Sequence, residues 1–447
     1  KPAPEEYWDK IADYCCNDVH STKEVHKHLA QDFAARQLLA SLSGLPVNAT
    51  TQKHTSKIIF GGDRRAKEQF IYTDLSEEFP GYVYDYGTST YCDEVTGEGG
   101  YVYAEPGFYE NVAVLDVASM HPTSIIQMNV FGKYTENFED LVKARLAIKH
   151  GDYDKARTML DGKLEPYLKN KEDAEKLSYA MKIVINIVYG LTSAGFDNDF
   201  KDIRNKDNIV AKRGALFMID LKKFVQAQGF TAAHIKTDSI KIPDATPEII
   251  KKVMEFGAKY GYTFEHEATY SKFCLVNDAV YIAKYGWAEK AKKIGTWDAT
   301  GAQFQNPYVY KMLFTGESIK FEDLCATKEV RSPWAMYMDP SEENATPADR
   351  KAGMVFVGRT GSFVPVHDGY RLVKLKGDEE TPYAVTGTKG YLWMEADMVK
   401  HQAALDMPFF DPEALSGVID MRYFDALIKS AKLTIEQFVR YEELVRA

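Results

Sequence analysis

Apolar residues follow two different spacings in the first half of the chain. Residues 109–118 read YENVAVLDVA, and this nearly continuous apolar stretch predicts a buried strand with Asp116 close to its C-terminal end. From about residue 136 to residue 190, charged and apolar residues alternate at helical spacing, and the run is broken at Gly151 and Pro166. The chain is therefore expected to pass from a strand into a long helical segment.

The same reading extends to the rest of the chain. The predicted elements are helices in 5–44 that end at Gly44, connecting structure with short strands in 48–100, a helix in 208–229, a hairpin in 230–244, a helix in 246–261 followed by strands to about 287, β-structure in 354–366 and 384–396, and helix in 424–447. Helices inserted between strands that carry aspartates indicate an α+β protein with an antiparallel sheet and an inserted helical lobe.

One predicted helix, residues 178–194, carries an unusually narrow polar stripe. At 100° per residue, Ser178, Lys182, Asn186 and Tyr189 fall within an arc of roughly 80°. Most of the remaining positions are apolar, whereas an ordinary surface helix has a wide polar face. The stripe favours the presentation of Lys182 to an anion; the alternative is an amphipathic helix with one snorkelling lysine.

Two aspartates lie at predicted strand ends. Asp116 is followed by a turn through Ser119 and His121, whose backbone N–H groups could hold phosphate oxygens; the alternative is a simple N-cap aspartate. In AAHIKTDSIKI, strict alternation places Lys236 and Asp238 on one face, unless a tight turn at Thr237-Asp238 exposes the carboxylate. An aspartate in an ordinary β-turn is the alternative there.

Composition limits the class of protein. Among the 447 residues, 45% are hydrophobic and 13% aromatic, which indicates a folded protein. No apolar run is long enough to cross a bilayer, and no leader precedes the first motif. The five scattered cysteines contain no CxxC pair, so neither a zinc site nor a disulfide framework is expected. We therefore expect a cytoplasmic protein without a membrane partner.

The net charge of −10 is unusual for a protein that binds DNA. A local basic groove can nevertheless lie within an acidic surface, and a catalytic metal site itself needs carboxylates. Two carboxylates from separate strands and a lysine from an intervening helix match the needs of nucleotidyl transfer. That reaction uses one Mg²⁺ to activate a 3′-oxygen and another to hold a triphosphate.

The order of three motifs resembles that in family-B DNA polymerases, and more particularly in those of bacteriophages. DVASMHPTSI (116–125) resembles the first palm motif D-x-x-S-L-Y-P-S-I, KIVINIVYG (182–190) resembles the fingers motif K-x3-N-S-x-Y-G, and KTDS (236–239) resembles the second palm motif D-T-D-S. GEGGY (97–101) resembles the Y-x-G-G linker, and YCCND (14–18) resembles the last exonuclease motif. The resemblance covers about residues 10–310.

The resemblance implies a right-hand polymerase with an antiparallel-sheet palm, helical fingers, a thumb and an extra C-terminal region. The implied divisions are 1–45 for an exonuclease remnant, 46–110 for the linker and palm entry, 111–130 and 191–288 for the palm, 131–190 for the fingers, and 289–447 for the thumb and C-terminal region.

The resemblance also assigns roles to residues. The catalytic residues would be Asp116, Asp238 and Lys182, and two Mg²⁺ ions, for which Mn²⁺ can substitute, would be held by Asp116, Asp238 and the Val117 carbonyl. The expected nucleotide-binding residues are Ser119, Met120, His121, Arg145, Lys149, Lys182, Asn186 and Tyr189. The expected DNA-binding residues are Gly99, Gly100, Gly190, Thr237, Lys284, Tyr285, Lys290, Lys292 and Lys293, and the exonuclease remnant would be Tyr14 and Asp18.

Some of these assignments have plain alternatives. Arg145 and Lys149 could form a solvated helix face, and the basic run from Lys290 to Lys293 could be a solvated charge run.

The sequence departs from the family pattern at several positions. Lys236 replaces the first Asp of D-T-D-S, His121 stands where the family has a Tyr under the incoming sugar, and Ile187 replaces the fingers Ser. Asp278 and Ala279 stand where a primer-gripping lysine pair is usual, so Lys284 and Tyr285 are candidates only. The first two exonuclease motifs are absent, and we expect no proofreading by this chain.

The expected function is template-directed DNA synthesis from dNTPs on primer–template DNA, in phage genome replication and hence in a host bacterial cytoplasm, with accessory proteins unidentified. The alternatives are a catalytically silent nucleic-acid-binding protein with a polymerase fold, for which Lys236 is the best support, and RNA or primase-like synthesis if His121 excludes ribonucleotides poorly. A nuclease would rest on Tyr14 and Asp18 alone and would lack its other ligands.

Overall fold

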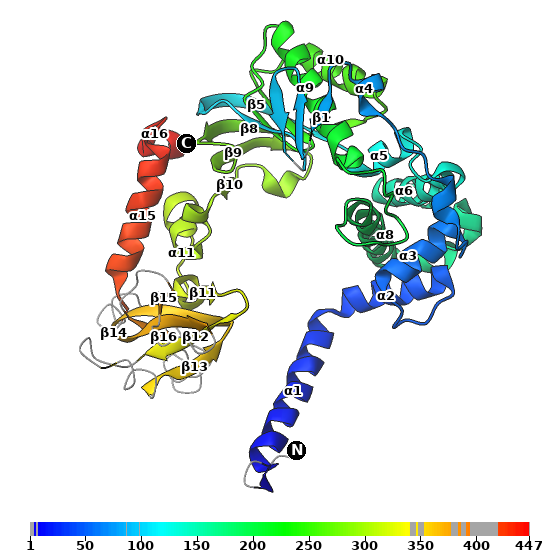
Figure 1. Cartoon of the computed structure of the whole chain (residues 1–447). Coiled ribbons are helices and arrows are strands. Elements are labelled where there is room, and N and C mark those ends of the chain that lie inside the picture. The colour runs from blue at the N-terminus through cyan, green and yellow to red at the C-terminus, as the bar shows by residue number, and fades with distance from the viewer. Residues whose placement is uncertain are drawn as a thin grey trace.

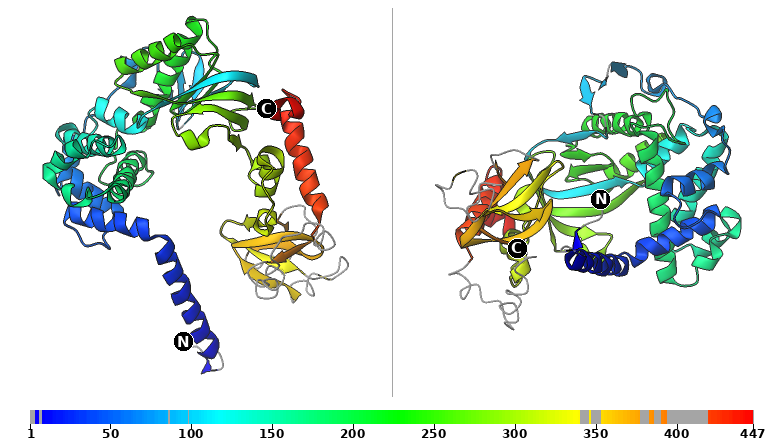
Figure 2. Two further views of the ribbon diagram at one scale, coloured as in Figure 1. Left: turned by 180° about the vertical axis from the view of Figure 1, so that it is seen from behind. Right: turned by 60° about the horizontal axis from the view of Figure 1, so that its bottom comes forward.

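The computed structural model describes residues 4–5, 8–85, 87–97, 99–339, 346, 353–376, 383–385, 390–393 and 419–446. These residues form an open arch (Figure 1). A central sheet lies at its crown, a helical lobe forms one limb, and a second sheet with a long helix forms the other. Helix α1 (Trp8–His28) extends away from the helical limb, as the views in Figure 2 also show.

The crown is a seven-stranded sheet in the order β10-β9-β8-β5-β7-β6-β4, and each neighbouring pair is antiparallel. Its strands are β4 (Val102–Ala104), β5 (Gly107–Val117), β6 (His234–Lys236), β7 (Ser239–Pro243), β8 (Phe264–Leu275), β9 (Tyr281–Ala288) and β10 (Trp297–Thr300). Strand β5 is central and is the strand predicted around Asp116. The expected combination of helices with an antiparallel sheet is therefore present.

The two faces of β5 pack into different cores because side chains alternate across a strand. Leu115 and Val117 face the core that also contains helix α9 (Ile209–Ala227), whereas Val112 and Val114 face a smaller cluster on the inner side of the arch. Asp116 alternates with Leu115 and Val117, so it shares the inner face with Val112 and Val114. This parity directs the carboxylate into the arch.

Helices α9 (Ile209–Ala227) and α10 (Pro247–Lys259) cover the outer face of the sheet (Figure 1). Arg213 of α9 is buried and binds the Glu78 carboxylate through two nitrogens, at 2.6 and 2.9 Å. Glu78 ends helix α4 (Leu75–Glu78), so this pair fixes an early segment of the chain to the outer layer. The small sheet that follows α4 consists of β1 (Val83–Asp85), β2 (Thr88–Tyr91) and β3 (Glu94–Thr96).

The helical limb is inserted between β5 and β6. Its helices are α2 (Ala30–Ser43), α3 (Thr51–Phe60), α5 (Met120–Gln127), α6 (Thr135–Lys149), α7 (Tyr153–Thr158) and α8 (Lys171–Thr192), with α2 and α3 contributed by the N-terminal part of the chain. Helix α8 begins at Asn170, whose side chain accepts a hydrogen bond from the Asp173 N–H, as an N-cap should. Its position and that of α6 confirm the helical segment predicted from periodicity.

Among the described residues, the other limb contains a six-stranded sheet and three α-helices. The strands are β11 (Ala326–Glu329), β12 (Trp334–Asp339), β13 (Val355–Gly358), β14 (Thr360–Lys376), β15 (Tyr383–Ala384) and β16 (Tyr391–Trp393), and the helices are α11 (Pro307–Tyr310), α15 (Met421–Ile435) and α16 (Tyr441–Val445). Helix α15 runs from the second sheet back to the crown (Figure 1). Part of the β-structure expected in 384–396 lies outside the described residues, as do residues 394–418 of the expected C-terminal region.

Two local expectations are resolved by the structure. Helix α2 ends before Gly44, which adopts the left-handed conformation (φ 71°) and confirms the predicted stop. The expectation of connecting structure with short strands in 48–100 was incomplete, because residues 51–60 form helix α3. Thr50 caps α3 by accepting a hydrogen bond from the Lys53 N–H, a local signal that the polar composition obscured.

Aromatic packing stabilises the helical limb, and we predict a large effect of its removal. Phe131 is fully buried, with ring centroids 5.6 Å from Phe60, 5.2 Å from Phe70 and 5.8 Å from Phe200. Phe131→Ala should lower the free energy of unfolding by about 3–5 kcal/mol, measured by urea denaturation, because the cavity cannot collapse among rigid rings. The matched control is Phe196→Ala, whose side chain is 61% exposed, with an expected change below about 0.5 kcal/mol. Equal effects would contradict this account.

Candidate active site

The sheet brings Asp116 and Asp238 to the same edge. Strand β5 ends at Val117, whose N–H donates a 2.8 Å hydrogen bond to the Asp238 carbonyl. Thr237 adopts a left-handed conformation (φ 57°), so the chain turns at Thr237-Asp238 between β6 and β7. The alternation that put Lys236 and Asp238 on one face was therefore wrong, and the tight turn was the correct alternative.

The Gly99-Gly100 segment lies against this turn. The Thr237 N–H donates to the Tyr101 carbonyl at 2.9 Å. A Cβ added to Gly100 would lie 2.6 Å from Cγ2 of Thr237 and 3.0 Å from its Cα, whereas one added to Gly99 would meet nothing within 4 Å. Gly100 is thus required for the close approach that holds the turn bearing Asp238.

Asp116 and Asp238 open into a cavity of about 340 Å³ between the sheet and the helical limb. The cavity is lined by Asp116, Val117, Ala118, Ser119, Met120, His121, Pro122, Arg145, Leu146, Lys149, Lys182, Ile185, Asn186, Asp238, Glu265 and Glu267. Apart from Tyr189, every residue expected from the sequence to bind a nucleotide is in this set. Residues as far apart in sequence as Asp116 and Glu267 thus meet in one cavity, because β5 pairs with both β7 and β8.

The helical wall of the cavity is basic. Lys182 and Asn186 lie on the exposed face of α8, as the polar stripe predicted, and Arg145 and Lys149 come from one face of α6. The Lys149 ammonium binds the Glu265 carboxylate at 2.9 Å, which joins the helical limb to strand β8. The Nε of Arg145 is a buried donor with no partner among the described residues.

His121, which lines the cavity, stacks on Tyr189 of α8. Their ring centroids are 4.0 Å apart and their planes differ by 11°. Burial lowers the pKa of His121 to about 4, so the imidazole is neutral near pH 7, and its buried Nδ1 has no partner among the described residues. The preceding turn depends on Ser119, which is left-handed (φ 57°) and starts helix α5. Met120 packs on Gly214, where a Cβ would approach its sulfur to 2.6 Å.

Negative charge is concentrated on the sheet side. Burial, followed by the charges of Asp238 and Glu267, raises the pKa of Asp116 to about 7. Burial is also the main cause that raises the pKa of Asp238 above its ordinary value. Lys241 partly offsets these charges, yet burial lowers its own pKa to about 8. Each carboxylate in this group therefore makes its neighbours harder to ionise, and a bound cation would relieve the repulsion.

The donor set fits magnesium with few protein ligands. Among the described residues, no three His, Cys, Asp or Glu side chains converge closely enough to hold a metal ion. Two carboxylates, Asp116 and Asp238, and the Val117 carbonyl remain. Mg²⁺ commonly keeps several waters and takes one or two carboxylates together with substrate phosphates, so a pair of aspartates is sufficient for it.

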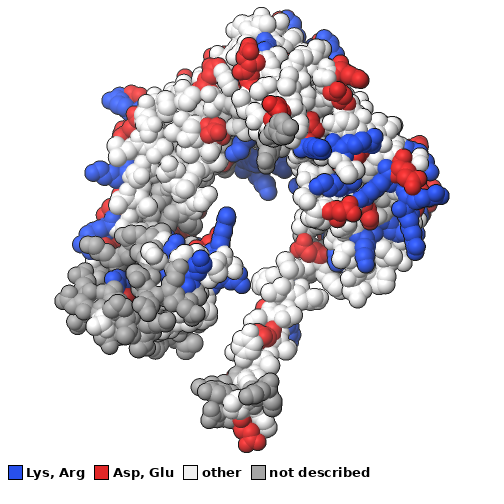
Figure 3. Space-filling view, viewed as in Figure 1, with Lys and Arg blue, Asp and Glu red and all other residues white. Residues whose placement is uncertain are grey.

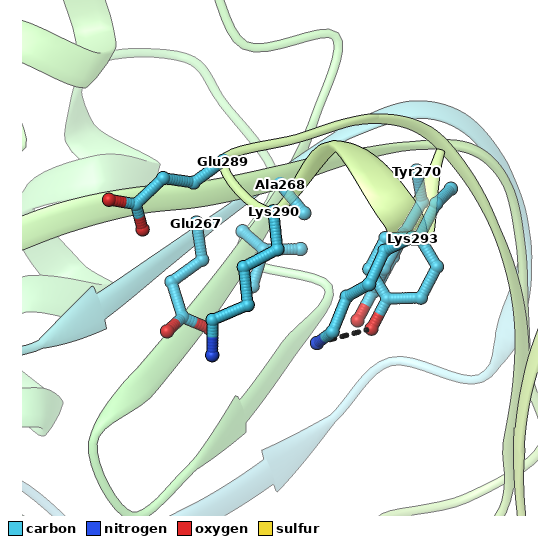
Figure 4. Close-up of a pocket in the computed structure, with 8 residues that line it drawn as sticks. Glu267, Ala268, Tyr270, Glu289, Lys290 and Lys293 are labelled. Carbon is cyan, nitrogen blue, oxygen red and sulfur yellow. Dashed lines mark hydrogen bonds between the residues drawn. The ribbon is translucent and has the colours of Figure 1, made fainter. Parts of the chain in front are cut away.

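A second, smaller pocket adjoins the first on the sheet. It is lined by Val114, Glu267, Ala268, Tyr270, Tyr285, Glu289, Lys290 and Lys293 (Figure 4). The Lys293 ammonium donates to the Tyr285 hydroxyl at 3.4 Å, and Lys290 and Glu267 point in the same direction in this view. In the space-filling view, Lys and Arg side chains gather on the inner wall of the arch below the sheet (Figure 3).

The other residues expected to bind DNA are dispersed. Lys284 lies over the Trp297 ring, 5.4 Å from its centroid, and lines neither pocket described above. Lys292 also lines neither pocket, although it belongs to the same short turn as Lys293. Gly190 lies on α8 at an open apolar surface beside Asn186.

Tyr14 and Asp18, expected as an exonuclease remnant, lie on the projecting helix α1. Tyr14 is 66% exposed and Asp18 is also exposed. Neither residue lines the cavities described above. These two residues are thus remote from Asp116 and Asp238.

Three charged residues of the site were missed by the sequence reasoning. Glu265 pairs with Asp116 in the β5–β8 register, Glu267 follows at an irregularity of that register, and Lys241 lies opposite Val114. The usable signal was the pair of glutamates two residues apart in FEHEATY, which suggests one charged strand face. The partner strand, however, could not be inferred from that pattern.

Comparisons with known proteins leave the family open. No protein-family model and no curated protein matches the chain. Among solved structures, the chain is similar to the family B DNA polymerase from the hyperthermophilic archaeon Pyrobaculum calidifontis, with a TM-score of 0.46 and 15% sequence identity. The match covers 97% of this chain and 58% of that polymerase, so this chain spans less than two thirds of its length. A similarity of this degree does not by itself identify an activity.

The helices give one further finding. In the described part of the chain, none is both long and apolar enough to span a bilayer.

The raised pKa of Asp116 predicts a pH-dependent cost in stability. Its folded pKa of about 7 exceeds the ordinary value of about 4, so ionisation destabilises the folded state as pH rises from about 4 through 7. Without metal, Asp116→Asn should therefore raise the free energy of unfolding by about 1–2 kcal/mol at pH 8, after allowance for solvent screening, and by little at pH 4.

Urea denaturation at several pH values in the presence of a chelator measures this difference. Asp244→Asn is the matched control, because Asp244 is exposed on the far side of the same hairpin. A gain for Asp116→Asn that is independent of pH would contradict the prediction.

Proposed function

We propose that the chain is a template-directed DNA polymerase that adds dNTPs to a primer 3′-hydroxyl. The observation that carries the proposal is the cavity in which Asp116 and Asp238 face the basic wall formed by Lys182 and Arg145. The proposal is supported by the buried Nε of Arg145 and Nδ1 of His121, which have no hydrogen-bond partner among the described residues and can bond a ligand there. A ligand with both anionic groups and a flat polar ring system would satisfy both atoms.

Magnesium would be held by Asp116, Asp238 and the Val117 carbonyl. When bound, two such ions lower the pKa of the primer 3′-hydroxyl and stabilise charge on the leaving pyrophosphate. The chain itself keeps the two carboxylates adjacent through the hydrogen bond from Val117 to the Asp238 carbonyl. It also keeps them partly desolvated, which strengthens their attraction for a divalent cation.

The helical wall would bind the triphosphate. Lys182 is exposed to the cavity. The Nε of Arg145, which has no partner among the described residues, would donate to a phosphate oxygen. Lys149 is engaged by Glu265, so its contribution would require that ion pair to open. Movement of α8 toward the sheet would bring Lys182 to a correctly paired nucleotide, which couples selection to assembly of the site.

The stacked pair His121 and Tyr189 would contact the sugar and base of the incoming nucleotide. A flat, neutral imidazole beneath the sugar leaves little room for a 2′-hydroxyl, because its ring is held against Tyr189 at 4.0 Å. Asn186, exposed beside these rings, would face the nascent base pair.

The arch fits this reaction at the level of domains. The crown sheet would act as the palm, the helical limb as the fingers, and the limb that contains α15 as the thumb around duplex DNA. Lys290 and Lys293 beside Tyr285 would bind phosphates of that duplex. Five further parts of this proposal rest on the motif resemblance alone. They are the family-B assignment, a bacteriophage type, an exonuclease remnant in residues 1–45, a host cytoplasmic location and the lack of proofreading.

The proposal predicts primer extension that depends on Asp238. With Mg²⁺, dNTPs and a primed DNA template, the unmodified chain should extend the primer, and Asp238→Asn should lower the rate by about a thousandfold or more, because one metal carboxylate is lost. Asp244→Asn, at an exposed position on the same hairpin, should extend normally.

Three results would contradict parts of the proposal. Equal extension by Asp238→Asn would refute the site assignment. Binding of primer–template without extension by any variant would favour a catalytically silent binding protein. Incorporation of rNTPs as readily as dNTPs would favour RNA or primase-like synthesis and would show that His121 excludes the 2′-hydroxyl poorly.

The packing of Gly100 on Thr237 predicts a difference between two neighbouring glycines. Gly100→Ala should reduce primer extension by about tenfold to a hundredfold, because the new methyl group displaces the turn that carries Asp238. Gly99→Ala should retain most activity, since its Cβ meets nothing within 4 Å. Steady-state extension assays with circular dichroism as a folding control measure both variants. Similar losses in the two variants would show that the close approach is not what matters.

A further inference from the structure

Positive charge flanks the two aspartates on both sides. Lys182 and Arg145 lie on the side of the helical limb. On the other side lies Lys236, which is opposite Ser239 in the β6–β7 register, and Ser239 is opposite Asp116 in the β5–β7 register. Because residues that lie opposite each other point to the same face of a sheet, Lys236 shares the inner face with the Asp116 carboxylate. The proposed function uses the first cationic group for the triphosphate and leaves the second without a ligand.

Lys241 belongs to this second group. In the register it lies opposite Val114, two residues before Asp116, and hence about 7 Å farther from the helical limb along β5. Its ammonium donates to the Ser239 hydroxyl at 3.1 Å and lies 5.9 Å from the centroid of the Tyr281 ring. The side chain is only 5% exposed.

The two lysines differ in accessibility. Lys236 is exposed at the surface of the arch, whereas Lys241 lies just beneath it. Among the residues that the structure describes, neither lysine forms an ion pair with a carboxylate, although Asp116, Asp238 and Asp298 act electrostatically on Lys241. Two neighbouring cations that form no ion pair with a carboxylate among the described residues favour the approach of an anion.

The path of the substrates identifies that anion. Nucleotidyl transfer brings two substrates to the aspartates, and the cavity beside α8 accommodates the triphosphate. The primer end would approach over the inner face of the sheet, the face on which Lys236 and Lys241 lie. Strands β6 and β7 are about 4.8 Å apart, so Lys236 begins about two strand spacings to the side of Asp116. An extended lysine side chain covers part of that distance, and a phosphate next to the reacting nucleotide would lie to the side of Asp116, so the two groups can meet.

We propose, on the basis of the proposed function, that Lys236 binds the last phosphodiester of the primer strand and that Lys241 beneath it reinforces the positive potential there. Lys236 thus positions the primer 3′ end, while Lys182 and Arg145 position the triphosphate. The competing explanation is that both lysines only balance the charge of Asp116 and Asp238. In that case their removal would weaken binding regardless of the charge on the primer.

A charge-removal cycle separates the two explanations. Binding of primer–template is measured by fluorescence anisotropy without dNTP, using a primer whose last internucleotide linkage is either natural or an uncharged methylphosphonate. Lys236→Met should weaken binding of the natural primer by about tenfold. The methylphosphonate should weaken binding to the unmodified chain by a similar factor and should have little further effect on Lys236→Met.

Matched controls accompany this cycle. Lys251→Met removes the same charge from the exposed surface of α10, on the outer side of the sheet, and should show the full effect of the methylphosphonate. A methylphosphonate several linkages upstream should not couple to Lys236. Lys241→Met should weaken binding of the natural primer less than Lys236→Met does, and should reduce the effect of the terminal methylphosphonate. Circular dichroism verifies that each variant is folded.

The outcomes distinguish this inference from the proposed function. If Lys236→Met and the terminal methylphosphonate together weaken binding by the product of their separate factors, Lys236 does not contact that phosphate, even if the chain extends primers. If the effects are coupled but no primer is extended, the phosphate contact stands and the polymerase activity fails. If the unmodified chain binds no primer–template, both proposals are wrong.

Discussion

The site depends on holding two half-buried carboxylates side by side at one edge of an antiparallel sheet. Asp116 and Asp238 repel each other in a partly desolvated environment, and burial together with this repulsion raises the pKa of Asp116 to about 7. The fold resists the repulsion through backbone hydrogen bonds, from Val117 to the Asp238 carbonyl and from Thr237 to the Tyr101 carbonyl. Backbone contacts of this kind do not change with protonation, so the arrangement persists before any cation binds.

This constraint explains several features around the site. Gly100 is needed because the turn must approach the preceding segment closely. The positive charges stay at a distance that avoids direct ion pairs with Asp116 or Asp238 among the described residues: Lys182 comes from α8 and Lys241 from β7. A direct ion pair would neutralise the carboxylates and compete with a metal ion. Under the proposed function, the surrounding cations would instead attract phosphates while the carboxylates remain available for a metal ion.

The two acidic residues and the basic residues of the site lie on different parts of the arch. The crown sheet has long paired strands such as β5 and β8, and it carries the carboxylates. The helical limb carries Lys182 and Arg145 and is joined to the sheet across the cavity by the ion pair between Lys149 and Glu265. Since a single ion pair of partly exposed groups is weak, it can open when a ligand competes for Lys149. Under the proposed function, the limb would therefore respond to a nucleotide without disturbing the carboxylates.

The sequence by itself determined the local elements and half of the site. The apolar run around Asp116, the polar stripe with Lys182 and the stop at Gly44 were readable because each depends on residues close in sequence. Strand pairing was not readable, since many partners satisfy the same alternation, and only the tertiary structure placed Glu265, Glu267 and Lys241 beside the aspartates. The same holds for the stack of His121 on Tyr189 and the orphaned Nε of Arg145. These features arise from contacts between distant segments, and the register of a sheet, not its composition, decides which side chains share a face.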